Sequence, residues 1–136
     1  VVRGLHFQTR NPQSKYVCVV SGKAWDVIVD LRKDSDTYKK WAAFELSAEN
    51  GCGLYIPAGF AHGFLSLEDN TAMLYQCEGK YDKETDTGIT VFDKDIAIDW
   101  PVLHEEVTLS DRDKTFMDLK YYEDNDLLNE FRVKNG

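Results

Sequence analysis

The sequence predicts an all-β domain with a short helical segment near its C-terminal end. Up to about residue 100, short apolar segments alternate with clusters of Gly, Pro, Asn and Asp, and no helical period is sustained. Residues 125–133 alone show a helical pattern, in which Leu127, Leu128 and Phe131 form an apolar stripe. Strands at this spacing are typical of a sandwich or barrel.

The size and charge of the chain limit what it can be. Its 136 residues, 43% of them hydrophobic, suffice for one compact core and are too few for two ordinary domains. Acidic side chains outnumber basic ones 24 to 16, and Lys and Arg form no dense cluster. We therefore expect no nucleic-acid partner. A small anionic ligand remains compatible with the sequence, because a local pocket can carry positive charge.

Cysteine usage and hydropathy indicate the compartment. Cys18, Cys52 and Cys77 are odd in number and widely spaced, so they suggest no disulfide framework and favour a reducing cytoplasm. No apolar run approaches the roughly 18 residues of a transmembrane helix. Residues 1–4 lack the layout of a signal peptide. We expect a soluble, cytoplasmic protein without membrane contact.

The clearest strand covers residues 24–31, where side chains alternate between two faces. One face carries Trp25, Val27, Val29 and Leu31, and the other carries Asp26, Ile28 and Asp30. Residues 15–20 form a second apolar segment just before it, and only residues 21–23 intervene. Because this connection is short enough for a hairpin turn, we expect the two strands to pair antiparallel.

Further apolar segments predict the remaining strands. They cover residues 41–46, 53–56, 61–67 and 72–77, and each is bounded by Gly, Pro, Asn or Asp. After Trp100 and Pro101 the chain becomes more polar.

Polar groups interrupt the apolar strands at three places, where burial without a partner would be costly. In residues 3–8, alternation sends His6 and Gln8 to one face and Arg3 to the other, unless Gly4 permits a bulge. Structural and functional explanations carry about equal weight for this segment taken alone.

The second place is residues 57–64, where small residues and aromatics flank His62. Small neighbours leave room for a ligand, although a hydrogen-bonded core histidine is the commoner explanation. The third contains Tyr75 within a strand and Tyr81 beyond its end. Tyrosines usually pack in cores or on surfaces, but a buried phenol can also transfer a proton and an exposed ring can stack on a flat base.

Metal and nucleophile chemistry find little support. His6, His62 and His104 are isolated and form neither HxH nor HxxxH, so we expect no metal site. No Gly-rich phosphate loop and no Ser or Cys nucleophile signature occurs.

Six motifs together resemble the dTDP-4-dehydrorhamnose 3,5-epimerase family, in order from Val1 to about Asp113. They are RGLHFQ (3–8), NPQSK (11–15), VDLRKDSDTYKKW (29–41), LSAEN (46–50), PAGFAHGF (57–64) and LSDRD (109–113). The resemblance implies a cupin-type antiparallel jelly-roll barrel, a homodimer, and epimerisation of dTDP-4-dehydro-6-deoxy-D-glucose at C3 and C5 to dTDP-4-dehydro-L-rhamnose.

The resemblance also implies catalytic roles. His6 corresponds to the base, Asp113 to the carboxylate that orients it, Tyr75 to the proton donor on the opposite face of the sugar, and Lys15 to the cation that stabilises the enolate. An Asp–His pair fixes one tautomer and leaves the other ring nitrogen free to accept a proton. Because the C3 and C5 protons lie beside the C4 ketone, no cofactor is required.

Binding residues follow from the same resemblance. Arg3 and His62 match positions around the sugar and diphosphate, Tyr81 matches the ring that stacks on thymine, and Gln8 and Arg112 are further candidates for contact with the ligand. Ordinary structural roles compete with these functions. Lys15 would by default be a solvated edge charge, and Asp113 would cap a turn or helix.

The match departs from the family in two respects, and alternatives follow. We expect residues 1–136 to form a single domain that lacks the family's N-terminal strands, and residues 88–93 lack a tryptophan usual in the family. An epimerase acting at C3 or C5 alone and a non-catalytic sugar-nucleotide-binding barrel remain open. A metal-dependent cupin is disfavoured by the histidine spacing.

Overall fold

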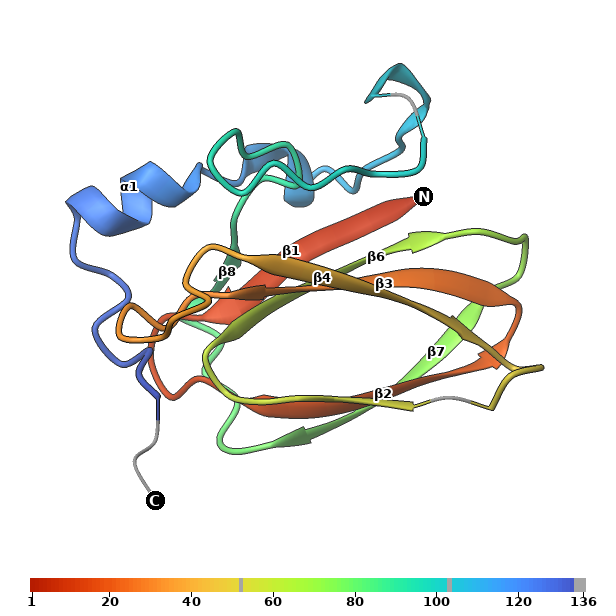
Figure 1. Ribbon diagram of the computed structural model, residues 1–136, viewed down its shortest axis with the longest axis horizontal. Helices are drawn as coiled ribbons and strands as arrows, with labels where there is room; N and C mark the ends of the chain where they lie inside the picture. The colour runs from red at the N-terminus through yellow and green to blue at the C-terminus, as the bar shows by residue number, and fades with distance from the viewer. Residues whose placement is uncertain (52, 103, 134–136) are drawn as a thin grey trace.

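The computed structural model describes residues 1–51, 53–102 and 104–133, except for the side chain of His104. In this part of the chain two antiparallel sheets face each other (Figure 1). Their strand orders are β4-β3-β6-β1-β8 and β5-β2-β7. The elements are β1 (Val2–Gln8), β2 (Ser14–Ser21), β3 (Lys23–Asp30), β4 (Trp41–Ser47), β5 (Gly53–Ile56), β6 (Phe60–Ser66), β7 (Ala72–Glu78), β8 (Asp86–Gly88), the 3-10 turns η1 (His104–Glu106) and η2 (Asp113–Thr115), and α1 (Leu119–Asp124). The predicted antiparallel β architecture is confirmed.

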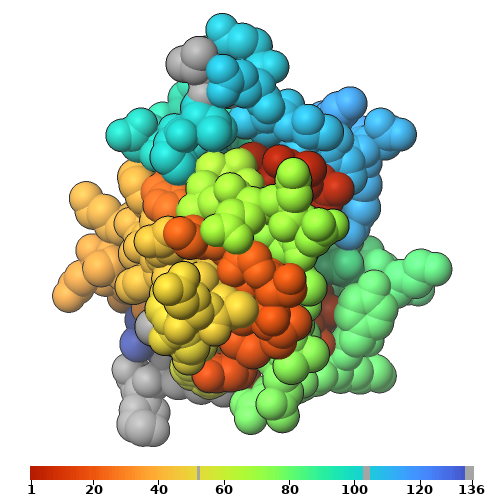
Figure 2. Space-filling view, turned by 90° about the vertical axis from the view of Figure 1, so that its right-hand side faces the viewer, coloured from red at the N-terminus to blue at the C-terminus, as the bar shows by residue number. Residues whose placement is uncertain are grey.

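The larger sheet is buried on both faces. Its inner face packs on the smaller sheet, where Ala24 of β3 meets Val17 and Ile56 in one core cluster. Its outer face carries Val27 and Val29, which belong to a second cluster with the chain that follows β8. The part of that chain up to α1, cyan to light blue, lies as a separate layer over the larger sheet, and the darker blue part after α1 runs down beside the edge of the sheets (Figures 1 and 2). The side chains of β3 alternate as predicted, and its two faces contribute to two different cores.

The hairpin predicted for β2 and β3 is wrong. β2 pairs with β5 and β7, whereas β3 pairs with β4 and β6, so the turn at residues 21–23 carries the chain from one sheet to the other. Gly22 has a φ of 78°, which suits such a tight connection. Inward-facing residues of both strands meet across the same core. Side-chain alternation alone does not distinguish packing across a core from pairing within a sheet.

The helix predicted at residues 125–133 is also wrong. The helix is α1, which precedes this segment and begins after Asp118, whose carboxylate accepts a hydrogen bond from the Tyr121 amide at 3.0 Å. Asp126 has a φ of 52°, which no right-handed helix accommodates. Leu128 and Phe131 are fully buried as expected, but Leu128 lies in a turn and Phe131 in the irregular chain just after it. Their spacing reflects tertiary packing.

A bulge in β1 places Arg3 and His6 on one face. Arg3 pairs with Phe64 and His6 with His62, so three residue steps on β1 oppose two on β6. The bulge requires close backbone approach, because a Cβ on Gly4 would lie 2.7 Å from the Cα of Gly63. The bulge that the sequence allowed at Gly4 is thus present, and both side chains belong to the inner face.

Candidate active site

His6 and Asp113 form a hydrogen-bonded pair. The distance between His6 Nε2 and Asp113 Oδ1 is 2.8 Å, and the backbone amide of Gly4 donates to Asp113 Oδ2 at 3.0 Å. Both carboxylate oxygens are engaged, and the Asp113 side chain is only 2% exposed. With Asp113 ionised, Nε2 carries the proton and donates it, which leaves Nδ1 as an acceptor. The His6 side chain is 30% exposed, so solutes can reach the ring.

The surroundings of His6 favour its neutral form. Burial lowers the pKa of His6 below the ordinary 6.5, and the charges of Lys15 and Arg112 lower it further. The hydrogen bond and charge of Asp113 oppose this shift without overcoming it. Near neutral pH the ring is therefore unprotonated and able to accept a proton.

Lys15 brings a positive charge to the same interior. On β2 it pairs with Ile56 and Cys77 and lies on the same face as Val17, which is fully buried in the inner core. Among the described residues no carboxylate lies within ion-pair distance of its ammonium group. The cation is thus available to a negatively charged atom of a ligand.

A second pair, His62 and Asp26, lies beside the first. His62 Nε2 and Asp26 Oδ1 are 2.6 Å apart, and both side chains are buried. His62 is the cross-strand neighbour of His6 on β6. Asp26 Oδ2 has no hydrogen-bond partner within the described part of the chain. Asp26 was not among the predicted site residues, although its position as an acid between Ala24 and Ile28 on the inner face of a strand was a usable signal.

Tyr75 approaches from the smaller sheet. Its ring packs edge to face on His62, with ring centroids 5.6 Å apart, and its hydroxyl donates to the sulfur of Met73 at 3.9 Å. Burial raises the pKa of Tyr75 well above the ordinary 10, and the negative charge of Asp26 adds to this effect. The phenol therefore stays protonated and can act as a proton donor. His6 and Tyr75 thus project into the same interior from facing sheets.

The other predicted binding residues lie around this interior. Gln8 is buried, and its amide group donates to the carbonyls of Asn11 and Lys80 at 3.0 and 3.2 Å and accepts from the Asp82 amide at 3.0 Å. These bonds hold two loops together, and contact of Gln8 with substrate stays a prediction. Tyr81 follows β7 and is 61% exposed, so its ring is free to stack.

Arg3 and Arg112 lie in different places. Arg3 donates to the Val2 carbonyl at 3.0 Å and lines a cavity of about 580 Å³ near Phe64. Arg112 bonds the carbonyl and carboxylate of Asp86 at 2.9 and 3.2 Å. The two arginines therefore have different partners, and the structure does not place them together.

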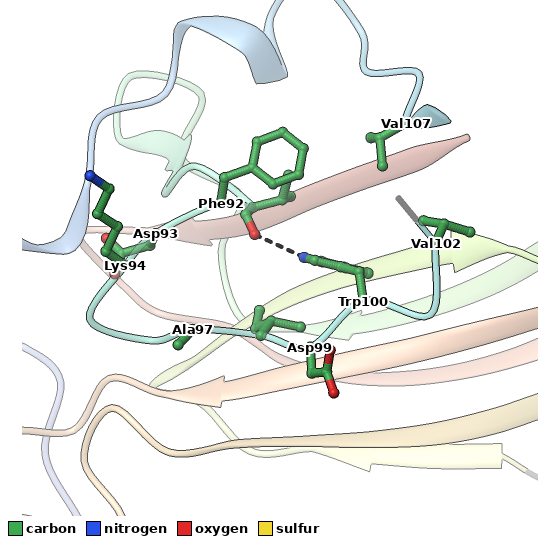
Figure 3. Close-up of a pocket in the computed structure, with 10 residues that line it drawn as sticks. Phe92, Asp93, Lys94, Ala97, Asp99, Trp100, Val102 and Val107 are labelled. Atoms are coloured by element: carbon green, nitrogen blue, oxygen red, sulfur yellow. Dashed lines mark hydrogen bonds between the residues drawn. The ribbon is translucent and has the colours of Figure 1, made fainter. Parts of the chain in front are cut away.

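A further cavity lies in the outer layer, away from these side chains. It has a volume of about 460 Å³, and its walls include Phe92, Trp100, Val102 and Val107 (Figure 3). The indole of Trp100 donates to the Val91 carbonyl at 2.8 Å and fixes one wall. None of the predicted site residues lines it.

Three other features bear on the chemistry. Over the described ranges, no three His, Cys, Asp or Glu side chains gather closely enough to hold a metal ion. Cys18 and Cys77 are free thiols, whereas Cys52 lies outside the described residues. No helix described here has the length and hydropathy needed to span a membrane.

The two facing sheets and their inward acid–base groups define a cupin-type jelly-roll barrel suited to proton transfer. The sequence profile of one family, dTDP-4-dehydrorhamnose 3,5-epimerase, matches residues 1–121. The chain belongs to this family. The resemblance first noted in the six motifs is confirmed over most of the chain.

Individual relatives agree. The dTDP-4-dehydrorhamnose 3,5-epimerase of Methanothermobacter thermautotrophicus is 47% identical over 121 residues, which cover 88% of this chain and 65% of the relative. The enzyme of the same name from Shigella flexneri is 44% identical over 126 residues, covering 90% and 68%. The chain thus spans about two thirds of the length of these relatives.

Solved structures show the same fold. The dTDP-6-deoxy-D-glucose-3,5-epimerase of Legionella pneumophila, in complex with dTDP-4-keto-L-rhamnose, superposes with a TM-score of 0.89 at 40% identity, covering 98% of this chain and 69% of that one. ChmJ, a 3'-monoepimerase from Streptomyces bikiniensis in complex with dTDP-quinovose, gives 0.85 at 35% identity, covering 94% and 65%.

Proposed function

We propose that this chain epimerises dTDP-4-dehydro-6-deoxy-D-glucose at C3 and C5 to dTDP-4-dehydro-L-rhamnose, in dTDP-rhamnose biosynthesis. The observation that carries the proposal is the placement of a neutral base, His6, and a protonated acid, Tyr75, on facing sheets of one barrel. An acid and a base on opposite faces of a sugar ring invert a carbon between them. Membership of the epimerase family supports the same reaction.

The reaction begins with proton removal. His6 Nδ1 takes the proton from C3 or C5, and the electron pair of the broken C–H bond moves toward the C4 carbonyl, which becomes an enolate. Asp113 stabilises the imidazolium that forms, because its carboxylate already accepts a hydrogen bond from the Nε2–H group. The Lys15 ammonium group stabilises the negative oxygen of the enolate.

Protonation on the opposite face completes the inversion. Tyr75 donates its phenolic proton to the same carbon, and the C4 carbonyl re-forms. Solvent then reprotonates the phenolate and takes the proton from His6. His62, held by Asp26, fixes the Tyr75 ring through their edge-to-face contact. No step requires a cofactor, because the ketone supplies the acidity of the neighbouring C–H bonds.

The remaining residues are assigned to the nucleotide end of the substrate. Tyr81, exposed after β7, stacks on thymine, and Arg3 supplies positive charge for the diphosphate. Arg112, which Asp86 holds elsewhere, is the weaker candidate for the same anionic ligand. Gln8 supports the site through the loops that it joins, one of which carries Tyr81. His62 contacts the sugar from the floor of the interior.

The test is hydrogen exchange with solvent. The sugar nucleotide is incubated with the protein in heavy water, and deuterium at C3 and C5 is followed by NMR. We expect exchange at both carbons for the wild type and none for His6→Ala. Tyr75→Phe should abolish inversion, whereas Tyr121→Phe, on the exposed side of α1, serves as its matched control and should act like the wild type.

The alternatives give distinct results. Exchange at a single carbon would identify a single-site epimerase, a class to which the relative ChmJ belongs. Binding of the sugar nucleotide without exchange at either carbon would contradict catalysis and identify a binding barrel.

We further infer that the chain assembles as a homodimer and acts in the cytoplasm. Several apolar side chains on the smaller sheet are 47 to 60% exposed, namely Tyr16, Val20, Tyr55 and Leu74, and such a patch is typical of an interface. The free thiols Cys18 and Cys77 suit a reducing compartment. Light scattering after size exclusion tests the assembly, and a monomeric mass would contradict it.

A further inference from the structure

Phe116, which lies outside the six motifs quoted above, contacts His6, the proposed base. It follows η2, and its ring lies edge to face with His6, with ring centroids 5.7 Å apart and planes at 86°. Arg112 lies over the same aromatic ring, 5.5 Å from its centroid. The phenyl ring is thus enclosed between the imidazole and a guanidinium group that Asp86 holds in place.

Gly88 creates the space for this ring. On β8 it is the cross-strand neighbour of His6, so the position that would normally carry a side chain beside the imidazole is empty. A Cβ at Gly88 would overlap both the Leu5 carbonyl and the Phe116 ring. Phe116 therefore occupies, from a distant part of the chain, the place of the missing side chain.

The backbone on either side of Phe116 is fixed. On one side Asp113 is bonded to Gly4 and His6, and on the other the Met117 carbonyl accepts from the Thr90 amide at 3.0 Å. The ring is therefore held against His6 by a chain that is anchored at both ends. An aromatic wall fixed in this way restricts rotation of the imidazole and excludes water from one of its sides.

We infer that Phe116 is a positioning residue for His6. The Phe116 ring holds the His6 imidazole in the orientation that the hydrogen bond to Asp113 requires. The inference rests on the proposed function, in which His6 is the base. The charged and titratable groups around His6 are Asp113 and Arg112 at η2, Lys15 on β2 and His62 on β6. Phe116 adds no charge to this set and acts through geometry and the exclusion of water.

The test compares Phe116→Ala with Met117→Ala, a matched control whose side chain is 49% exposed. The titration of the His6 ring is followed by NMR and assigned with His6→Ala. In Phe116→Ala we expect the pKa of His6 to rise toward 6.5, because water replaces the ring and burial is the largest cause of its lowering. We expect kcat to fall roughly tenfold with KM nearly unchanged, because a misplaced base impairs proton transfer more than binding. Met117→Ala should match the wild type.

Conservative variants keep the test decisive. Phe116→Tyr should show the wild-type pKa of His6. Phe116→Leu should show a pKa between those of the wild type and Phe116→Ala, and it remains a test if the alanine variant fails to fold. An unchanged His6 titration in Phe116→Leu and Phe116→Ala would overturn the inference, as would a shifted pKa with an unchanged kcat. If the wild type itself shows no exchange at C3 or C5, the proposed function fails, while the titration still judges whether Phe116 controls His6.

Discussion

At the scale of single residues, His6 is governed by opposing neighbours. Burial and the charges of Lys15 and Arg112 lower its pKa, while Asp113 raises it. In the proposed reaction His6 must be unprotonated to act as a base. Because its pKa is lowered, the proposed activity should persist below pH 6.5 and be lost only at the lower pH where His6 becomes protonated. Replacing either type of neighbour should therefore shift the acidic limit of activity in opposite directions.

We expect Lys15→Met to raise the pKa of His6 and Asp113→Asn to lower it. The first change removes a repelling cation, and the second removes the negative charge that stabilises the imidazolium, while the asparagine keeps one acceptor oxygen. NMR titration of the His6 ring measures both shifts directly, without depending on activity. Lys114→Met, which removes an exposed cation that is not among the groups affecting His6, is the control. Shifts of the same sign in the two variants would contradict this account.

The family resemblance indicated His6, Asp113 and His62, whereas neither the resemblance nor a residue pattern indicated Asp26. Asp113 was found only through the resemblance, since a polar run such as LSDRD reads locally as a turn. Asp113 and His6 are 107 positions apart in the sequence, and no local pattern predicts a contact over such a separation. Asp26 was overlooked because its partner, His62, lies on another strand.

At the scale of elements, strand existence was predictable and strand pairing was not. The segments that form β4, β5, β6 and β7 were recognised from apolar runs and their bounding turn residues. Which strands become neighbours depends on where the chain crosses between the sheets, and a short crossing such as the turn at residues 21–23 has the same local pattern as a hairpin. Short β8 was missed for a related reason, since three residues are too few to show alternation.

The close approach of β1 and β6 yields a prediction at this scale. A Cβ on Gly63 would lie 2.7 Å from the Arg3 carbonyl oxygen, so Gly63→Ala should force the strands apart at the bulge. We expect a loss of about 1 to 3 kcal/mol in the free energy of unfolding, as for other overpacked sites. Urea denaturation measures the loss.

The control for this variant is Gly51→Asn. Gly51 has a φ of 64°, which Asn tolerates, and no atom lies within 4 Å of a Cβ built there. We expect a change below about 0.5 kcal/mol. An unchanged free energy of unfolding in Gly63→Ala would contradict the close approach of β1 and β6 in the structure.

At the scale of the whole molecule, two cores are separated by the larger sheet. Leu128 lies in the outer core and is fully buried, whereas His6, the proposed base, lies on the inner face of the larger sheet. Leu128→Ala should lower the free energy of unfolding by about 2 to 5 kcal/mol. The folded protein should keep the His6 titration of the wild type, because no group near His6 has changed.

Its matched control is Leu127→Ala. Leu127 is the adjacent leucine and is 36% exposed, so we expect a loss well below that of Leu128→Ala. Thermal unfolding monitored by circular dichroism gives both values. A shifted His6 titration in Leu128→Ala would mean that the outer layer acts on the site through the sheet.

The position of β1 between β6 and β8 has a consequence for synthesis of the chain. β1 is made before either of its partners, and the bond of His6 to Asp113 joins residues 107 positions apart. As the nascent polypeptide leaves the ribosome, β1 cannot pair with β6 or β8 until those strands have emerged, and His6 cannot bond Asp113 until residue 113 has emerged. The pair of His6 and Asp113 is therefore among the last parts of the molecule to form. A chain whose synthesis stops before residue 113 contains His6 without its carboxylate partner.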